Sequence, residues 1–264
     1  MNNRKVLITG ASKGIGKAIA KALLNLGYTV IGTSRDPGNI KDKVEGLEYV
    51  KLDLNDEQSI EDCLKKIGWV DVLINNVGQS QIGPAEELPL EKIKEMFQTN
   101  LLGMIKLTQG FLPEMREKRR GVIINIGSLV GRFAIPFQSI HAASKSALAA
   151  FSWSLRNEVM SYGVKVVVIE PNDINTTIEP EMTVNNNSEY KKNVFKSKEA
   201  RDKKMAKAPG PEVVADKVVK ILKKKNPRPF YNVGGMGPFF VFCKRLLPDK
   251  VVERLLRKNY KIND

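Results

Sequence analysis

Short apolar runs rich in β-branched residues alternate along the chain with longer segments whose apolar residues recur every three or four positions. The short runs predict seven strands, near residues 5–9, 28–33, 47–52, 70–75, 121–127, 164–170 and 228–233. The longer segments predict helices, most clearly at 14–26, 56–66, 91–116, 143–161 and 212–225. This alternation is typical of βαβ units. We therefore expect an α/β protein with a doubly wound, seven-stranded parallel sheet and helices on both faces, in a single domain over residues 1–264.

Two segments depart from this pattern. Residues 173–209 are polar, rich in Asn and Lys, and lack a sustained apolar period. They follow the sixth strand, at the edge of the sheet where ligands bind in such folds, and therefore predict a mobile substrate lid. Residues 238–264 predict a basic extension of two short amphipathic helices separated at Pro248, with apolar positions 239, 242, 243, 246 and 247 on one face. Packing against the fold or a second subunit explains that face, and an interfacial membrane helix is the alternative.

Composition limits the class of protein. A chain of 264 residues, 42% of them hydrophobic, is long enough for a full core and is not disordered. The first strand-like run begins at Lys5, which leaves no room for a signal peptide, and no apolar run approaches the roughly 18 residues of a membrane span. We expect a cytoplasmic protein. Cys63 and Cys243 lack the spacing of a metal or redox motif, so we expect free thiols and no metal site.

The net charge of +14 is concentrated in the C-terminal part. Residues 1–189 contain 22 Lys and Arg against 22 Asp and Glu, whereas residues 190–264 contain 21 against 7. A basic segment of this kind indicates either a solvated surface or an anionic partner. The lysine-rich stretch lacks interleaved aromatic residues, which argues against nucleic acid. An anionic membrane, contacted peripherally, is therefore the partner that remains possible. We expect no binding of nucleic acid.

A glycine-rich turn lies between the first predicted strand and the first predicted helix. It reads Thr9-Gly10-Ala-Ser12-Lys13-Gly14-Ile15-Gly16. The glycines permit a tight turn and a close approach of the backbone, and the start of the helix offers free N–H groups and the positive end of its dipole to a pyrophosphate. The turn therefore predicts a dinucleotide site.

Further motifs follow at characteristic intervals: Asn75-Asn76-Val-Gly78, Asn100, Ser128 and Lys145. With the glycine turn, they resemble the short-chain dehydrogenase/reductase family over nearly the whole chain. The resemblance implies a Rossmann-type fold and hydride transfer between a nicotinamide nucleotide and a small-molecule carbonyl or secondary alcohol. It also implies a homodimer or homotetramer, formed through the helices near 91–116 and 143–161. Similar proteins often act on lipids, so we expect a hydrophobic substrate.

Cofactor preference depends on the end of the second strand. An acidic residue there would hold the ribose 2′-hydroxyl of NAD, but this chain has Arg35, and Lys13 adds a second cation. We expect a preference for NADP(H), with NAD(H) still open because Asp36 follows. The resemblance implies that Asp53 caps the adenine and that Ile174 and Thr176 contact the carboxamide. The complete predicted cofactor site is Thr9, Gly10, Ser12, Lys13, Gly14, Ile15, Gly16, Arg35, Asp53, Leu54, Asn76, Gly78, Lys145, Pro171, Ile174 and Thr176.

The catalytic set implied by the resemblance is Asn100, Ser128, His141 and Lys145. Ser128 would bind the substrate oxygen, Lys145 would bind the ribose hydroxyls and supply positive charge, and Asn100 would hold a proton-relay water. In the family, a tyrosine acts as acid and base at the position that His141, the only histidine here, occupies. A second difference is Pro171-Asn172 in place of the family's Pro-Gly; among non-glycine residues, Asn best tolerates a left-handed backbone.

Histidine at this position changes the acid–base chemistry. The neighbouring Lys145 should hold the imidazole pKa below its usual value of about 6.5. A neutral imidazole can accept a proton from an alcohol or donate a hydrogen bond to a carbonyl, but it is a poor proton donor. Two interpretations remain open: altered catalysis, or a nucleotide-binding sensor or scaffold that has lost the reaction.

Overall fold

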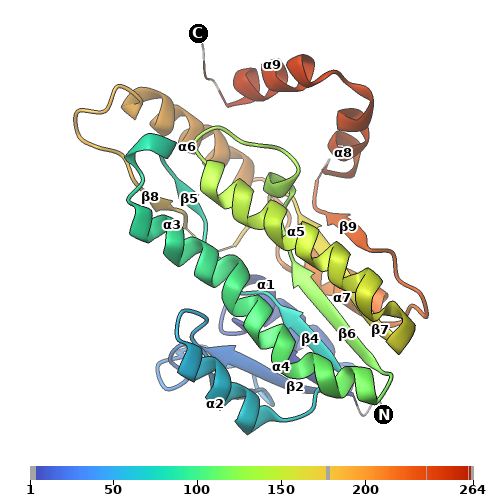
Figure 1. Cartoon of the computed structure of the whole chain (residues 1–264). Helices are drawn as coiled ribbons and strands as arrows, with labels where there is room; N and C mark the ends of the chain where they lie inside the picture. Colours follow the sequence, from blue (N-terminus) through green and yellow to red (C-terminus); the bar gives the residue numbers. More distant parts are fainter. Residues whose placement is uncertain (1–3, 177–178, 236, 261, 263–264) are drawn as a thin grey trace.

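Seven parallel strands form the central sheet of the computed structural model, which describes residues 4–176, 179–235, 237–260 and 262 (Figure 1). In spatial order the strands are β3 (Glu48–Lys51), β2 (Thr29–Ser34), β1 (Lys5–Ile8), β4 (Val72–Asn75), β6 (Gly121–Ile126), β7 (Val164–Pro171) and β9 (Phe230–Val233). The direction of winding reverses between β1 and β4, and the crevice at such a switch point is where ligands bind in open α/β sheets. The predicted seven-stranded, doubly wound, Rossmann-type sheet is confirmed.

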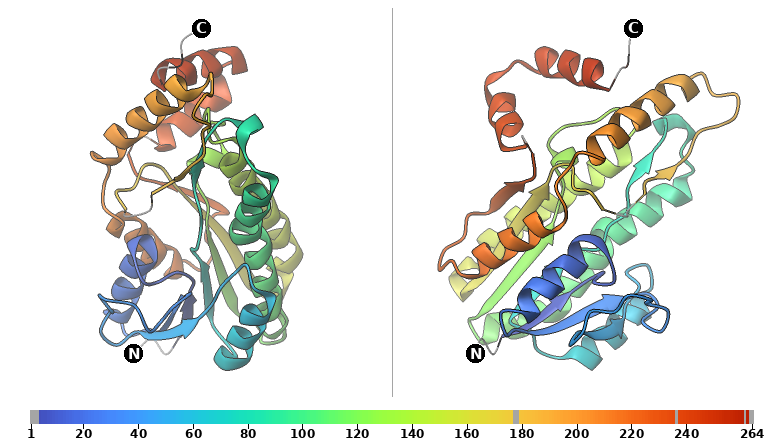
Figure 2. Two further views of the ribbon diagram at one scale, coloured as in Figure 1. Left: turned by 90° about the vertical axis from the view of Figure 1, so that its left-hand side faces the viewer. Right: turned by 180° about the vertical axis from the view of Figure 1, so that it is seen from behind.

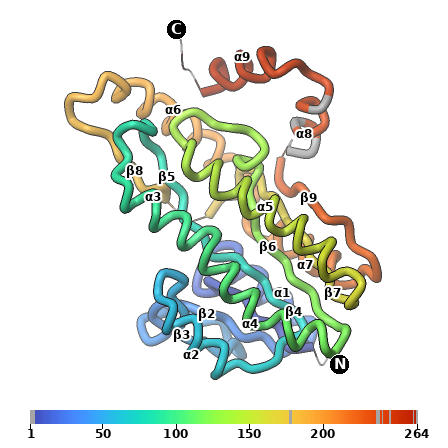
Figure 3. The backbone as a smooth tube through the Cα atoms, viewed as in Figure 1, coloured from blue at the N-terminus to red at the C-terminus, as the bar shows by residue number. Residues whose placement is uncertain are grey.

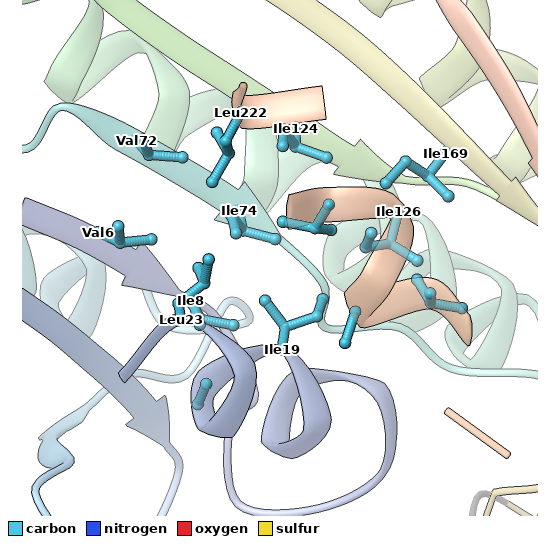
Figure 4. Packing of buried hydrophobic residues seen from close by; sticks show 14 of the residues in the cluster. Val6, Ile8, Ile19, Leu23, Val72, Ile74, Ile124, Ile126, Ile169 and Leu222 are labelled. Atoms are coloured by element: carbon cyan, nitrogen blue, oxygen red, sulfur yellow. The ribbon is translucent and has the colours of Figure 1, made fainter. Parts of the chain in front are cut away.

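Helices cover both faces of the sheet (Figure 2, left). On one face lie α1 (Gly14–Leu24) and α7 (Glu212–Leu222), and on the other lie α2 (Glu57–Ile67), α4 (Gly103–Glu117) and α5 (Ser139–Val159). Because successive strand residues point to opposite faces, Val6 and Ile8 pack in the first layer and Leu7 packs in the second. Figure 4 shows the first layer, in which strand residues such as Ile74 meet Ile19 of α1. Apolar residues on both faces explain the unbroken apolar runs of the sequence.

The helix predicted over 91–116 is not continuous. It consists of α3 (Leu90–Phe97), a π-helical turn η2 (Gln98–Leu102) and α4. A π-helical turn inserts an extra residue into the helix and is frequent at functional sites. The turn carries Asn100, whose side chain is fully buried. A hydrophobic period averaged over the whole segment does not reveal such an insertion.

The lid segment is more regular than its sequence predicts. It contains β8 (Glu181–Met182), which pairs with β5 (Gln81–Ile82) in a separate parallel ladder, and the helix α6 (Lys191–Met205). The sequence predicted no helix here, and the role of the segment as a substrate lid stays a prediction. The buried stripe of this helix is Val194, Ser197 and Ala200, which includes only one large apolar residue and produces no visible hydrophobic period.

After β9 the chain leaves the sheet and forms α8 (Gly237–Leu246) and α9 (Asp249–Asn259), on either side of Pro248 as predicted. Both helices lie at the same end of the molecule as α6 (Figure 3). Three short 3₁₀ helices complete the described elements: η1 (Ala85–Glu87), η3 (Leu129–Gly131) and η4 (Met160–Tyr162). Within the described ranges, no helix is both long and apolar enough to cross a membrane.

Candidate active site

A cavity of about 1840 Å³ lies at the carboxyl ends of the strands. One end is formed by the glycine turn, the middle by β6 and α5, and the far end by α6, α8 and α9. Most of the predicted site residues line it: Gly10, Ser12, Lys13, Gly14, Ile15, Arg35, Asp53, Leu54, Asn76, Gly78, Ser128, His141, Lys145, Pro171, Ile174 and Thr176. Thr9, Gly16 and Asn100 do not line the cavity, so the structure does not bring these three predicted residues to its wall.

Thr9 and Gly16 determine the conformation of the glycine turn without lining the cavity. The Thr9 hydroxyl oxygen accepts hydrogen bonds from the backbone N–H groups of Asn76 at 2.8 Å and Val77 at 3.1 Å. The Asn76 amide donates to the carbonyl oxygens of Thr9 and Gly10, at 2.9 and 3.1 Å. A Cβ atom at Gly16 would lie 2.3 Å from the Gly10 carbonyl oxygen. The backbone can therefore pass this point only with glycine at position 16.

The start of α1 fits a phosphate-bearing ligand. Lys13 precedes the helix without a side-chain cap, whereas Asp56 caps α2 by accepting from the Gln58 N–H at 3.0 Å. Gly10 and Gly14 have φ values of +67° and +55°, a conformation that favours glycine. The first N–H groups of a helix that lacks a side-chain cap form an anion site, and here that turn of α1 lines the cavity.

Cations and carboxylates both line the nucleotide end of the cavity, and one of the cations, Lys17, forms an ion pair with Asp42. Arg35 and Lys13 line it together with Lys17 and Lys41, which the sequence analysis missed. Lys17 lies one helical turn after Lys13, and that spacing was the available signal. Asp36 also faces this end, but its carboxylate accepts hydrogen bonds from the backbone of Gly38 and from both nitrogens of Asn39. The side-chain hydrogen bond from Asn39 is the main reason that the Asp36 pKa is lowered.

His141 and Lys145 lie four residues apart on α5, so both reach the cavity from one face of the helix. The Lys145 Nζ atom donates to the Ile126 carbonyl oxygen at 3.1 Å. A Cβ atom at Gly78 would lie 3.1 Å from that Nζ, so glycine at position 78 leaves room for the lysine. The His141 Nδ1 atom lies 3.4 Å from the Ser80 hydroxyl oxygen. Ser80 was not predicted as a site residue.

Burial determines the protonation of both side chains. His141 is 8% exposed, and burial, with smaller contributions from Lys145 and Arg201, lowers its pKa from 6.5 to about 3. Burial lowers the Lys145 pKa from 10.5 to about 8. Imidazole is therefore neutral at neutral pH, as the sequence predicts. The main cause is desolvation, and the neighbouring lysine that the sequence suggested is second.

Asn100 connects two parts of the site. Its amide nitrogen donates to the Gln79 carbonyl oxygen and to the Ser144 hydroxyl, both at 3.0 Å, and its carbonyl oxygen accepts from the Gln79 N–H at 2.7 Å. Ser144 in turn donates to the His141 carbonyl oxygen at 2.9 Å. Asn100 thus fixes the segment after β4 against α5. The proton-relay water that the resemblance implies at Asn100 stays a prediction.

Ser128 and Asn172 occupy the ends of β6 and β7. Ser128 precedes η3, and its hydroxyl oxygen accepts from the Val130 N–H at 3.2 Å. Asn172 lines the cavity and donates its backbone N–H to the Val233 carbonyl oxygen at 2.7 Å. Its φ is not positive, so the tolerance of Asn for a left-handed backbone is not used here.

A cluster of polar and charged side chains that the sequence did not predict also lines the cavity, beside its apolar residues: Asp173, Arg201, Lys204 and Tyr260. The Lys204 ammonium lies 4.1 Å from the centre of the Tyr260 ring. Burial raises the pKa values of Asp173 and Tyr260 and lowers that of Lys204. The contact joins α6 to the end of the C-terminal extension. Since Arg201, Lys204 and Tyr260 belong to no recognisable motif, only the position of Asp173 after Pro171-Asn172 offered a signal.

The pKa of His141 makes stability depend on pH. In the unfolded chain the imidazole takes up a proton below about pH 6.5, whereas in the folded protein it does so only near pH 3. Stability is therefore greatest above pH 6.5 and falls as the pH decreases toward 3, by about 1.4 kcal/mol per pH unit for this one group. His141→Gln should remove that slope while other titrating groups stay the same. Urea unfolding of both proteins across this pH range measures the difference, and parallel pH dependences would contradict the buried neutral imidazole.

Fold and site together define a dinucleotide-binding α/β protein, and comparison with known proteins identifies the family. Residues 4–187 match the short chain dehydrogenase family. The chain is 34% identical to a 3-ketodihydrosphingosine reductase of Bacteroides thetaiotaomicron, over 99% of this chain and 100% of that one. This chain therefore belongs to the short-chain dehydrogenase/reductase family, as its motifs predict.

Solved structures agree with this assignment. A short-chain dehydrogenase from Streptomyces avermitilis superposes with a TM-score of 0.82 and 30% identity, covering 98% of this chain and 96% of that one. The closed form of a serine dehydrogenase complexed with NADP+ gives a TM-score of 0.74 with 27% identity, covering 88% and 95%. The family in these comparisons is one of oxidoreductases that bind nicotinamide nucleotides.

Proposed function

We propose that this protein is an NADP(H)-dependent oxidoreductase that transfers hydride between nicotinamide and a carbonyl or secondary alcohol of a hydrophobic substrate. One observation carries the proposal: a single cavity runs from the uncapped start of α1 and Arg35, past Ser128, His141 and Lys145, to an apolar end. The nucleotide end, the polar centre and the apolar end therefore lie in the order that such a reaction requires.

The chain's own residues account for binding at the nucleotide end. The glycine turn receives the pyrophosphate, and the cations around Arg35 receive a 2′-phosphate. Asp36 is a weak competitor for a ribose hydroxyl, because its carboxylate is engaged with its own loop. Asp53 and Leu54 border the adenine, and Ile174 and Thr176 the carboxamide. When bound, NADPH supplies the hydride. The NADP+ complex of the similar serine dehydrogenase supports this cofactor.

Proton transfer differs from that of a tyrosine enzyme. We assign Ser128 and the neutral imidazole of His141 to hydrogen bonds with the substrate oxygen. Neutral imidazole does not release a proton readily, but Lys145, one turn further along α5, has a pKa of about 8. The Lys145 ammonium is thus a proton source at neutral pH. Its burial also keeps water from competing for that proton.

The far end of the cavity favours an apolar substrate. It is lined by Phe133 and Ile135 after β6, by Met205 of α6, and by Leu247 and Leu256 of the C-terminal extension. The similar Bacteroides protein is named a 3-ketodihydrosphingosine reductase, an enzyme for a ketone. We therefore propose a ketone attached to a long apolar chain as the substrate class, enclosed by the lid segment and the C-terminal extension.

The low pKa of His141 also favours the second candidate, a nucleotide-binding sensor or scaffold with little turnover. A side chain that stays neutral down to about pH 3 cannot replace tyrosine as a proton donor. In that case the cofactor end would be retained while the reaction is lost. The two candidates share nucleotide binding and differ only in turnover.

We further propose a homodimer or homotetramer in the cytoplasm. Trp153 on α5 and Leu102 in η2 are half exposed, on the two helical regions that the sequence analysis assigned to subunit contacts. Exposed large apolar side chains on adjacent helices favour an interface.

Cofactor preference tests the proposal directly. Titration of protein fluorescence should show tighter binding of NADPH than of NADH, and Arg35→Ala should weaken NADPH binding roughly 10- to 100-fold, the loss of one charge-assisted hydrogen-bonding group. NADH binding should change little. Lys43→Ala, an exposed cation outside the cavity, is the matched control. A preference for NADH that survives Arg35→Ala would refute the assignment. Oxidation of NADPH with a panel of long-chain ketones then separates an enzyme from a scaffold.

A further inference from the structure

The two C-terminal helices lie together at one end of the molecule (Figures 1 and 3), and both carry exposed large apolar side chains. Phe242 and Leu246 of α8 are 60% and 69% exposed, and Val251 and Leu255 of α9 are 40% and 53% exposed. Positions 242 and 246 are four apart and so share a face of α8, as 251 and 255 share a face of α9. In the single chain these four side chains stay exposed. Packing against the fold therefore does not explain why they are apolar.

The same helices also line the cavity. Cys243 of α8 and Val252 and Leu256 of α9 face it, and Leu255 is both exposed and part of the lining. The apolar outer surface is therefore continuous with the apolar end of the cavity.

Positive charge gathers around this surface. Residues 238–264 contain seven Lys and Arg against three acidic residues, and residues 191–207, which include α6, contain eight against two. The contact of Lys204 with Tyr260 brings the two segments together. Lys250 and Arg254 are exposed on α9, next to Val251 and Leu255 in the sequence. Residues 1–189 are electrically balanced, so the net charge lies in residues 190–264, the part of the chain that includes α6, α8 and α9.

We propose that α8 and α9 dock onto an anionic phospholipid membrane and that the cavity receives its hydrophobic ligand from the bilayer. Apolar side chains that alternate with Lys and Arg are the pattern of a helix lying in the membrane interface, where burial of apolar surface and attraction to anionic lipid add together. A second copy is a poorer occupant, because it would bring an equally basic surface to the contact. Docking itself is independent of hydride transfer. Only the delivery of substrate rests on the proposed function.

Vesicle sedimentation tests the docking surface on the full-length protein. The protein should sediment with phosphatidylcholine vesicles that contain phosphatidylglycerol, should bind pure phosphatidylcholine vesicles much more weakly, and should be released by high salt. Phe242→Ser with Leu246→Ser should lower the partition coefficient at least roughly tenfold, because two large apolar side chains are removed. Lys250→Glu with Arg254→Glu should lower it at least about 25-fold, since each basic residue near the surface contributes about a fivefold factor.

Matched controls lie elsewhere on the molecule. Met160→Ser removes a side chain that is 61% exposed in η4, and Lys223→Glu with Lys225→Glu makes the same change of charge beyond α7. Both controls should bind vesicles nearly as the unaltered protein does, and NADPH affinity should be unchanged in every variant, which shows that they fold. An equal loss of vesicle binding in the controls and the test variants would refute the proposed docking surface. Equal binding of the unaltered protein to neutral and anionic vesicles would also refute it. Self-association without lipid that the α8 and α9 substitutions abolish would assign the face to a second copy. Vesicle binding without any turnover would leave docking intact and refute the proposed reaction.

Discussion

His141→Tyr is expected to raise the rate of carbonyl reduction at least about 100-fold, the usual contribution of a well-placed general acid. Ser128 and Lys145 already line the cavity where a tyrosine at position 141 would need them, and Asn100 already fixes α5. The phenol would have an acidic proton to donate, whereas imidazole with a pKa of about 3 has none at neutral pH. NADPH affinity should stay nearly constant, because the glycine turn and Arg35 are unchanged. Steady-state oxidation of NADPH with a long-chain ketone, and a fluorescence titration, measure the two quantities.

His141→Phe is the control for this substitution, since it supplies a ring without an acidic proton. It should bind NADPH and should not gain activity. If His141 is itself a working base in alcohol oxidation, the unaltered protein will already turn over, and His141→Tyr will shift its pH profile instead of creating activity. A protein that is inactive before and after the change, on both lipid and small carbonyls, would refute the oxidoreductase and leave the nucleotide-binding scaffold.

Gly16→Ala is expected to weaken NADPH binding at least roughly tenfold and to lower the free energy of unfolding by about 1–3 kcal/mol, the range for overpacking a tight site. The new Cβ would lie 2.3 Å from the Gly10 carbonyl oxygen and 2.6 Å from the Asn76 amide nitrogen. The carbonyl belongs to the backbone of the turn and cannot rotate away. The turn must therefore shift, and with it the N–H groups at the start of α1. Fluorescence titration with NADPH and urea unfolding measure the two effects.

Gly27→Ala separates backbone strain from this clash. Gly27 has a φ of +78°, but among the described residues no heavy atom beyond its chain neighbours would lie within 4 Å of a Cβ at this position. Alanine there costs only the strain of a left-handed backbone, about 1–2 kcal/mol. This variant should lose stability and keep its affinity for NADPH. Wild-type affinity in Gly16→Ala would mean that the turn after β1 is not where the cofactor binds.

The sheet could be predicted from the sequence because buried strands and amphipathic helices leave a strong periodic signal. Runs such as Val166-Val-Val-Ile169 have apolar residues in both core layers, so their burial is visible residue by residue. The signal fails where burial is slight or the backbone is irregular. Helix α6 buries only Val194, Ser197 and Ala200, and the π-helical turn at Asn100 changes the helical period over a single turn.

The candidate site also contains some residues that the sequence predicts and others that it does not. Local motifs predicted the glycine turn, Ser128, His141 and Lys145, because each sits at the end of a strand or on one helical face. Ser80 and Arg201 belong to no motif and reach His141 only through the fold. The sequence also predicted a neutral His141 but attributed it to Lys145, since burial, the larger cause, is not visible in a list of neighbours. For Thr9, Gly16 and Asn100, the motif predicted a site residue, but it did not show that the residue supports the cavity wall without lining it.

The cavity is assembled from two stretches of chain, residues 10–176 and residues 201–260. The family match covers residues 4–187, and this stretch includes the glycine turn, Ser128, His141 and Lys145. Of the residues at the apolar end, Phe133 and Ile135 also lie within it, whereas Met205, Leu247 and Leu256 lie beyond it. Substitutions in the C-terminal stretch can therefore alter substrate choice without altering the residues that face the nucleotide and the reacting centre. Exchanging the C-terminal stretch between relatives is accordingly a way to change substrate specificity with few alterations to the rest of the protein.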